Sequence, residues 1–206
     1  MQTMWKITFV LLGLLTLAGC QANCVTEKAN GEADEVKNWL IAEEPNYDIV
    51  DVNCVEDGLY VLLTTFTPPG VEDYYTMIRA YIVVADDDSY TIKELEDAHG
   101  AGSAGFSAEL LGADDVTVLF GDIGSAAYDF ETDAMRDVSF TEVVVKLSDG
   151  KEFAIPVEND APYIVIMDAG VEVSDIVYKT EDGDILYSDY YSEPLDASPY
   201  YDDKAM

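Results

Sequence analysis

Acidic residues at alternate positions form the first chemically suggestive pattern of the chain, Asp129-x-Glu131-x-Asp133. Such carboxylates occupy the first ligand positions of a calcium-binding loop, which also needs Gly at its sixth position and a bidentate Glu at its twelfth. Ala134 and Phe140 stand at those positions, so the stretch is not an EF-hand. A looser calcium site completed by backbone carbonyls stays an alternative, here and at the acidic turns 86–88 and 182–184. We expect polar hairpin tips instead and predict no metal ligands.

Three glycines, Gly100-x-Gly102-x-x-Gly105, have the spacing of the dinucleotide-binding fingerprint. That fingerprint works only between a strand and the N-terminus of a helix, which together hold the pyrophosphate. A short polar segment, 91–98, precedes the glycines, and no long helix is expected after them. We therefore predict a flexible loop and no cofactor.

The only histidine, His99, lies close in sequence to Ser103 and Ser107, so the residue types of a catalytic triad are present. Ser103 is not in a nucleophile elbow, because position 101 is Ala, and nothing in the loop fixes the geometry of His99 and Ser103. We expect a solvent-facing histidine. One histidine and two distant cysteines are also too few ligands for a zinc site.

Paired carboxylates can hydrolyse a wall polysaccharide, one acting as the acid and the other as the base or nucleophile. The chain holds 42 Asp and Glu residues, so some pair lies at a suitable separation by chance. A carboxylate-dependent hydrolase is therefore an alternative function, for which the sequence names no catalytic residues.

The start of the chain has the layout of an export signal, with one basic residue, Lys6, before the apolar run 7–17. The run is shorter than a bilayer-spanning helix and leads into small residues, as in a secretory signal. It ends in Leu17-Ala18-Gly19-Cys20, which resembles the lipobox of bacterial lipoproteins. The resemblance implies that a signal peptide, 1–19, is removed and that the lipidated Cys20 holds the mature chain to the lipid bilayer.

The charge balance is extreme, with 42 Asp and Glu against 10 Lys and Arg and a formal net charge of -32. Such a chain repels nucleic acid and anionic lipid head groups, so nucleic acid is excluded as a partner. The acids are spread along the whole chain, as expected for a solvated surface suited to a saline or alkaline exterior. A cation-binding surface is the alternative.

Two further cysteines, Cys24 and Cys54, are candidates for a disulfide, because an exported protein meets oxidising conditions. The bridge would close a loop of roughly 30 residues and stabilise the fold by about 3 kcal/mol in the chain-entropy model. Cys24 lies in the tether predicted after the lipid, so two free thiols remain the alternative.

Hydrophobic periodicity predicts one helix followed by many strands. Spacings of three and four residues predict a helix over 32–44, ended by Pro45. Alternation and β-branched runs then predict strands, joined by turns such as Asp57-Gly58. The predicted strands are 47–55, 59–66, 74–85, 90–93, 116–120, 138–147, 151–157, 163–167, 173–180 and 184–187.

The predicted fold class is mainly β, of the α+β type: a short N-terminal helix, an antiparallel β-meander, and a second half like a β-sandwich or partial barrel. A weak helical turn is expected at 107–111, inside a Gly/Ala-rich loop. The predicted segments are a signal peptide (1–19), a tether (20–30), the helix plus β-meander (31–95), the Gly/Ala-rich loop (96–115), a β-rich half (116–188) and an acidic Tyr-rich tail (189–206).

This order of elements is similar to that of small extracytoplasmic lipoproteins of Gram-positive bacteria. The strand end 120–123 and the hairpin 178–187 carry the resemblance, which implies an address and no activity. We therefore expect a non-catalytic protein, lipid-anchored on the extracytoplasmic face of the cell membrane, that binds or supports an unidentified envelope partner. The alternatives are the wall hydrolase and a calcium-dependent module.

Overall fold

The computed structural model describes residues 27–67, 76–86, 89–101, 105–129, 132–183 and 185–186. In these ranges the protein is mainly β with one helix, as the sequence predicts. The elements are α1 (Glu27–Glu43), β1 (Asp48–Glu56), β2 (Leu59–Phe66), β3 (Met77–Asp86), β4 (Ser89–His99), β5 (Glu109–Gly112), β6 (Val116–Ile123), β7 (Ala126–Asp129), β8 (Ala134–Asp137), β9 (Phe140–Leu147), β10 (Glu152–Pro156), β11 (Ala161–Asp168), β12 (Val173–Thr180) and β13 (Ile185–Leu186).

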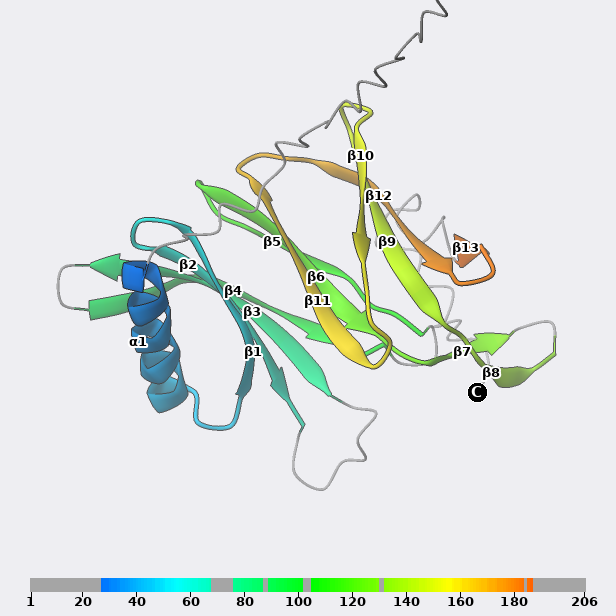
Figure 1. The fold of residues 1–206 in the computed structure, drawn as a ribbon, viewed down its shortest axis with the longest axis horizontal. Helices are drawn as coiled ribbons and strands as arrows, with labels where there is room; N and C mark the ends of the chain where they lie inside the picture. Colours follow the sequence, from blue (N-terminus) through cyan, green and yellow to red (C-terminus); the bar gives the residue numbers. More distant parts are fainter. Residues whose placement is uncertain are drawn as a thin grey trace, which may run out of the picture.

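The elements stack in layers, from α1 on one side of the molecule to β9 and β12 on the other (Figure 1). The helix covers a first sheet, β1-β2-β3-β4; a middle sheet, β11-β6-β5, and an outer sheet, β10-β9-β12-β13, follow. The hairpin β7–β8 forms a small sheet of its own. Because the middle sheet packs on the first sheet with one face and on the outer sheet with the other, the second half is a sandwich that shares a core with the first half.

Strands β2 and β3 lie inside the first sheet and bury both faces. Val61 and Ile82 face the middle sheet, whereas Tyr60 and Tyr81 face α1. A strand that is covered on both sides needs an apolar residue at nearly every position. This requirement explains why these stretches are continuously apolar in the sequence instead of alternating with polar residues.

The helix α1 begins at Glu27, inside the segment predicted as a tether, and ends at Glu43. Glu, Lys and Ala at its start are good helix formers, so Gly31 does not interrupt it. Val36 and Leu40 are fully buried against the first sheet, and the ring of Trp39 lies 5.5 Å from that of Tyr90. Among the described residues, no helix is long and apolar enough to cross a membrane.

Arg79 fastens the end of α1 to the first sheet. Its guanidinium donates to both carboxylate oxygens of Asp97, at 2.5 and 2.8 Å, and lies 3.8 Å from the carboxylate of Glu44. The ring of Tyr47 lies 4.7 Å from the guanidinium carbon, which is within cation–π range. Two-pronged, charge-assisted bonds of this kind are strong, and the bond to Asp97 raises the pKa of Arg79 above its ordinary value.

The strand β6 is the centre of the structure, paired with β5 and β11 and covered on both faces. Val118 and Phe120 pack toward the first sheet, whereas Leu119 and Ile123 pack toward the outer sheet. At Gly121 a Cβ atom would lie only 2.0 Å from the carbonyl oxygen of Ser107. This close approach of two backbones requires glycine.

Tyrosine rings fill the core between the middle and outer sheets. Phe106 stacks on Tyr178 with ring centres 3.9 Å apart. The hydroxyl groups of Tyr163 and Tyr178 lie 2.9 Å apart, and both lie within hydrogen-bond distance of the carbonyl oxygen of Ser107, at 3.0 and 3.2 Å. The buried hydroxyls therefore find partners, as burial of a polar group demands.

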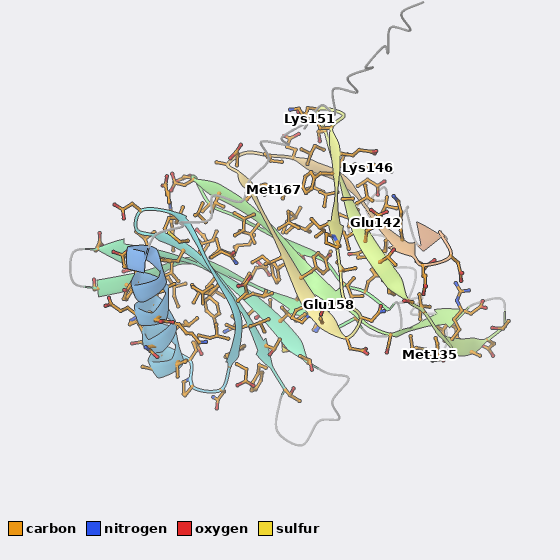
Figure 2. The ribbon with its side chains drawn as sticks, viewed as in Figure 1. Met135, Glu142, Lys146, Lys151, Glu158 and Met167 are labelled. Carbon is orange, nitrogen blue, oxygen red and sulfur yellow. The ribbon has the colours of Figure 1, made fainter. Side chains whose placement is uncertain are left out.

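The far face of the outer sheet carries two ion pairs between β9 and β12, whose β9 members are labelled in Figure 2. Lys146 contacts Asp175 at 2.7 Å, and Lys179 contacts Glu142 at 2.9 Å. The buried pair of Val144 and Val177 lies between them in the strand register. The ion pairs thus enclose an apolar cross-strand contact, which is the unit that stabilises a sheet.

The stretch 96–115 differs most from the sequence-based prediction. The strand β4 continues to His99, and β5 forms where a helical turn is predicted. The end of β4 lies on a sheet edge with mostly exposed polar side chains, so its sequence lacks the periodic pattern of a strand. The four residues of β5 are too few for periodicity, and pairing with β6 determines their conformation.

Elsewhere the predicted strands match the structure closely. Both β2 and β12 have the predicted bounds, and most other strands differ by a few residues at their ends, where boundaries are least determined. The hairpin β7–β8 was not predicted, because its strands have only four residues each, too few for an alternating pattern to be recognised. Pairing partners, more than local sequence, fix such short strands.

Replacing Gly121 by Ala should destabilise the fold by roughly 2–3 kcal/mol, because the new methyl group would overlap the Ser107 carbonyl group. Gly112→Ala on β5 is the matched control, since nothing lies within 4 Å of a Cβ atom there. Urea denaturation of both variants measures the difference. Equal unfolding free energies for the two variants would contradict the close approach at Gly121.

Candidate functional site

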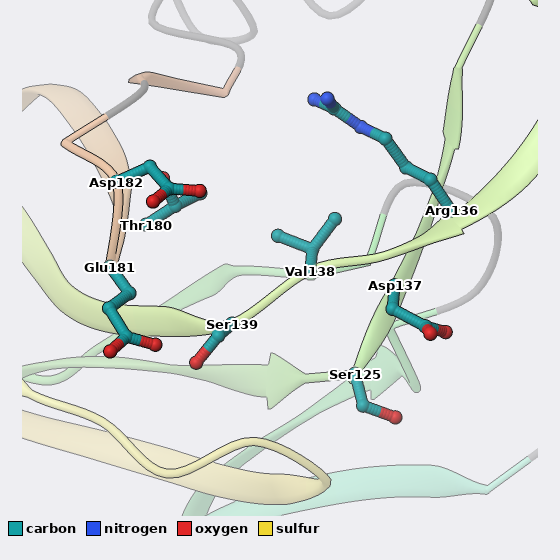
Figure 3. Close-up of a pocket in the computed structure, with 8 residues that line it drawn as sticks. All are labelled: Ser125, Arg136, Asp137, Val138, Ser139, Thr180, Glu181 and Asp182. Atoms are coloured by element: carbon teal, nitrogen blue, oxygen red, sulfur yellow. The ribbon is translucent and has the colours of Figure 1, made fainter.

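A polar cleft of about 440 Å³ lies where the hairpin β7–β8 meets the end of β12. Figure 3 shows Arg136 on one side of this cleft and Thr180 and Asp182 on the other. Its lining residues are Ser125, Arg136, Asp137, Val138, Ser139, Thr180, Glu181 and Asp182.

Backbone hydrogen bonds hold the walls of the cleft in place. The amide of Val138 donates to the carbonyl oxygen of Ser125 at 2.9 Å, and that of Glu181 donates to Ser139 at 2.9 Å. Val138 is only 9% exposed and anchors the segment between β8 and β9 in the core. The polar side chains therefore extend from a backbone that is fixed on both sides.

Arg136 gives the cleft its chemical character. Within the described part of the chain its guanidinium forms no ion pair, unlike Arg79 and most of the lysines. The carboxylates of Asp137, Glu181 and Asp182 line the same cleft, but none of them forms an ion pair with Arg136. A ligand that combines an anionic group with hydroxyl or amino donors would find partners for both in this arrangement.

The carboxylates of the cleft are poorly placed for acid catalysis. Asp137, Glu181 and Asp182 are all exposed. A glycosidase acid keeps its proton near neutral pH because its environment is apolar or because a second carboxylate is close. Among the described residues, no aromatic ring lines the cleft to hold a sugar. The arrangement therefore favours binding over glycoside hydrolysis.

A second polar feature, at Asp122, was not predicted from the sequence. Its Oδ2 atom accepts a hydrogen bond from the amide of Ala101 at 3.0 Å, and its own amide donates to the hydroxyl of Ser107 at 3.1 Å. Burial raises the pKa of Asp122 above its ordinary value, and the negative charge of Asp160 adds to this effect. The sequence signal for this feature is that Asp122 is the one charged residue of the strand β6.

Of the three cysteines singled out in the sequence, only Cys54 lies within the described residues. Cys20 and Cys24 lie outside them. Cys54 lies on β1, half-buried on the side that faces α1, and its thiol donates to the carbonyl oxygen of Glu56 at 3.4 Å. Lipidation of Cys20 and the Cys24–Cys54 disulfide therefore stay predictions.

The glycine motif lies between two strands, so it lacks the helix that a dinucleotide site requires. Gly100 donates to the carbonyl oxygen of Thr76, and Gly105 has a positive φ of 80°. Gly102 and Ser103 lie outside the described residues. His99 is exposed at the end of β4, as predicted.

The calcium-like stretch forms the tip of the hairpin β7–β8. The hydroxyl of Tyr128 donates to the carboxylate of Asp133, which has a positive φ of 56°. Glu131 lies outside the described residues. Across the described ranges, no three His, Cys, Asp or Glu side chains come close enough together to hold a metal ion.

Comparisons of the chain with protein-family models, with curated proteins and with solved structures each find no match. No activity can therefore be transferred from a relative. The function has to be inferred from the geometry and from the residues themselves.

Asp122→Asn should stabilise the protein increasingly as the pH rises above 3.8, the ordinary pKa of the side chain. Because burial raises the folded-state pKa, the folded chain retains a proton that the unfolded chain has lost. The contribution of Asp122 to the free energy of unfolding is then most favourable below its pKa in the unfolded chain. This contribution declines as the pH rises through its pKa in the folded protein. Asparagine does not titrate, so the difference in unfolding free energy should grow over this window.

Asp149→Asn is the control with the opposite sign. The hydrogen bond from Lys151 lowers the pKa of Asp149, so its contribution is present above the unfolded pKa and is lost as the pH falls. Chemical denaturation of wild type and both variants across acidic to neutral pH measures the two differences. A pH-independent difference for Asp122→Asn would contradict the effect of burial.

Proposed function

We propose that the protein is a lipid-anchored extracytoplasmic lipoprotein whose β-rich part has a non-catalytic binding or supporting role at the cell envelope. The observation that carries the proposal is the box Leu17-Ala18-Gly19-Cys20 directly after an apolar run with a single preceding charge, Lys6. Basic region, apolar region and box stand in the order that export and lipidation require.

Lipid chains explain how a highly acidic protein stays at a membrane that repels it. Each buried CH₂ group contributes about 0.8 kcal/mol, so one chain binds marginally and two or more bind stably. The chain has a net charge of -32, and anionic head groups oppose its approach. A covalent anchor at Cys20 overcomes this repulsion without any basic surface patch.

The cleft near Arg136 supports a binding role. Its acids are exposed, and it offers a guanidinium, carboxylates and hydroxyl groups to one ligand. A wall hydrolase remains the alternative from a different class, and it would need a carboxylate pair in which one group is kept protonated. The exposure of Asp137, Glu181 and Asp182 weighs against that alternative.

Replacing Cys20 by Ser should abolish lipidation and leave an unprocessed precursor or a released protein. Cys24→Ser is the matched control, because it removes a nearby thiol that lies outside the box. Membrane fractionation with metabolic labelling by a fatty acid measures the result. Membrane-bound and labelled Cys20→Ser protein with its signal removed would contradict the proposed anchor.

The melting temperature of the protein should rise substantially with sodium chloride. The Debye length falls from about 30 Å at 0.01 M to about 3 Å at 1 M, so salt screens repulsion among the 42 acids. Calorimetry with sodium chloride, and with matched millimolar calcium or magnesium, measures the effect. A flat response to sodium chloride would exclude surface repulsion, and a large response to calcium alone would favour the calcium-dependent module.

A further inference from the structure

Among the described residues, the strand β11 pairs with β6 on one side and with no strand on the other, so this edge is open within the described structure. Asp122 on β6 directs its amide and carbonyl groups toward Ser107, away from β11, and backbone groups alternate in direction along an antiparallel strand. The residues that face Asp122, Phe120 and Val118, which are Pro162, Ile164 and Ile166, therefore direct their backbone groups outward.

These outward groups form a set that another strand can use. The N–H and C=O groups of Ile164 and Ile166 and the C=O group of Pro162 have no hydrogen-bond partner in the described part of the chain. Pro162 lacks an N–H. Because Pro162 lies opposite Asp122, whose backbone groups point away from β11, the missing N–H removes no hydrogen bond between β11 and β6. The side chains of both isoleucines are partly exposed and pack on the core between the first and middle sheets.

Other sheet edges of the described structure are protected against strand addition. The edge strand β1 has two register shifts and carries Asp48, Asp51 and Glu56. The edge strand β4 has a register shift and four charged residues within 93–97, and β10 is short and ends in Pro156. Charges, bulges, proline and short length are the usual protections of exposed edges.

The edge of β11 has less of this protection, although Pro162, the second residue of the strand, offers no outward N–H. Its register on β6 is unbroken over eight residues, and no charge lies between Ala161 and Met167. Acids stand at its two ends instead, with Glu158 and Asp160 before the strand and Asp168 at its end. Figure 2 labels Glu158 and Met167 near these opposite ends. An added strand would therefore meet a neutral centre between two negative ends.

We propose that β11 accepts an extended peptide segment of a partner protein by strand addition, and that this segment has alternating apolar residues flanked by basic residues. Main-chain hydrogen bonds to Ile164 and Ile166 supply the pairing, as in other cases of strand addition. The acids at both ends, such as Asp160 and Asp168, attract the basic flanks and set the length of the segment.

A second copy of the chain fits this edge less well. In an antiparallel pair of β11 strands centred on Ile164, Asp160 of one copy would lie opposite Asp168 of the other, and like charges across strands are destabilising. Both copies would also carry a net charge of -32. Charge complementarity therefore selects a basic partner.

A basic, extended peptide is the kind of partner that the proposed binding role would involve, and the inference rests on that role. Its test does not depend on the lipid anchor. The full chain in detergent presents the same edge whether or not Cys20 is modified. Loss of membrane association would contradict the anchor alone, and absence of peptide binding would contradict the edge alone.

The test uses a capped eight-residue peptide with Lys at both ends and alternating Thr and Val between them. Fluorescence anisotropy should show saturable binding, at least about fivefold tighter than that of the same peptide with Glu ends. Ile164→Pro should weaken binding by about tenfold, because it removes an outward N–H and obstructs pairing. Ala154→Pro is the matched control, since Ala154 faces outward in the same way on the edge of β10.

A second variant keeps the test independent of folding defects caused by proline. Glu158→Lys combined with Asp168→Lys changes exposed residues and should reverse the preference, so that the Glu-ended peptide binds more tightly. The proposal is overturned if no peptide binds, if Ile164→Pro binds as well as wild type, or if the double variant retains the original preference. Salt-dependent dimers that Ile164→Pro abolishes, without peptide binding, would assign the edge to a second copy instead.

Discussion

Burial of β6 on both faces is the constraint on which the rest of the structure depends. A strand covered on both sides must be apolar nearly throughout, and its neighbours must satisfy its backbone hydrogen bonds. Val118 and Phe120 on one face and Leu119 and Ile123 on the other join the two cores. The close approach at Gly121 brings Ser107 into contact with this strand, and the Ser107 carbonyl in turn accepts from the buried tyrosines. The two halves of the chain are therefore one packed unit through the middle sheet.

The same constraint determines where a chain with 42 acids can carry them. Cores bounded by several sheets leave only turns, sheet edges and outer faces for charge. Asp97 and Asp122 are exceptions: Asp97 is matched by the two-pronged guanidinium of Arg79, and the half-buried Asp122 accepts a hydrogen bond from the amide of Ala101. On a surface with so many acids, another acidic cluster says little about function. A long strand edge without charge, as in β11, is unusual there, because the chain has no general shortage of acids.

The cleft at Arg136 and the edge of β11 offer two kinds of recognition on one scaffold. The cleft presents side-chain donors and acceptors and suits a small polar ligand. The edge presents backbone groups and suits an extended chain. Both surfaces would be available on a domain tethered to a membrane by lipid.

The sequence by itself determined the fold class, because long apolar runs such as 59–66 and 173–180 and turn residues between them specify strands locally. It also determined the predicted export signal, whose information lies in consecutive residues around Cys20. Only the tertiary structure decided the elements and sites that depend on distant partners. The edge part of β4 and the short β5 become strands because β3 and β6 pair with them. The grouping of Arg136 with Glu181, and the open edge at Ile164, likewise arise from pairing between strands far apart in sequence, which no local pattern records.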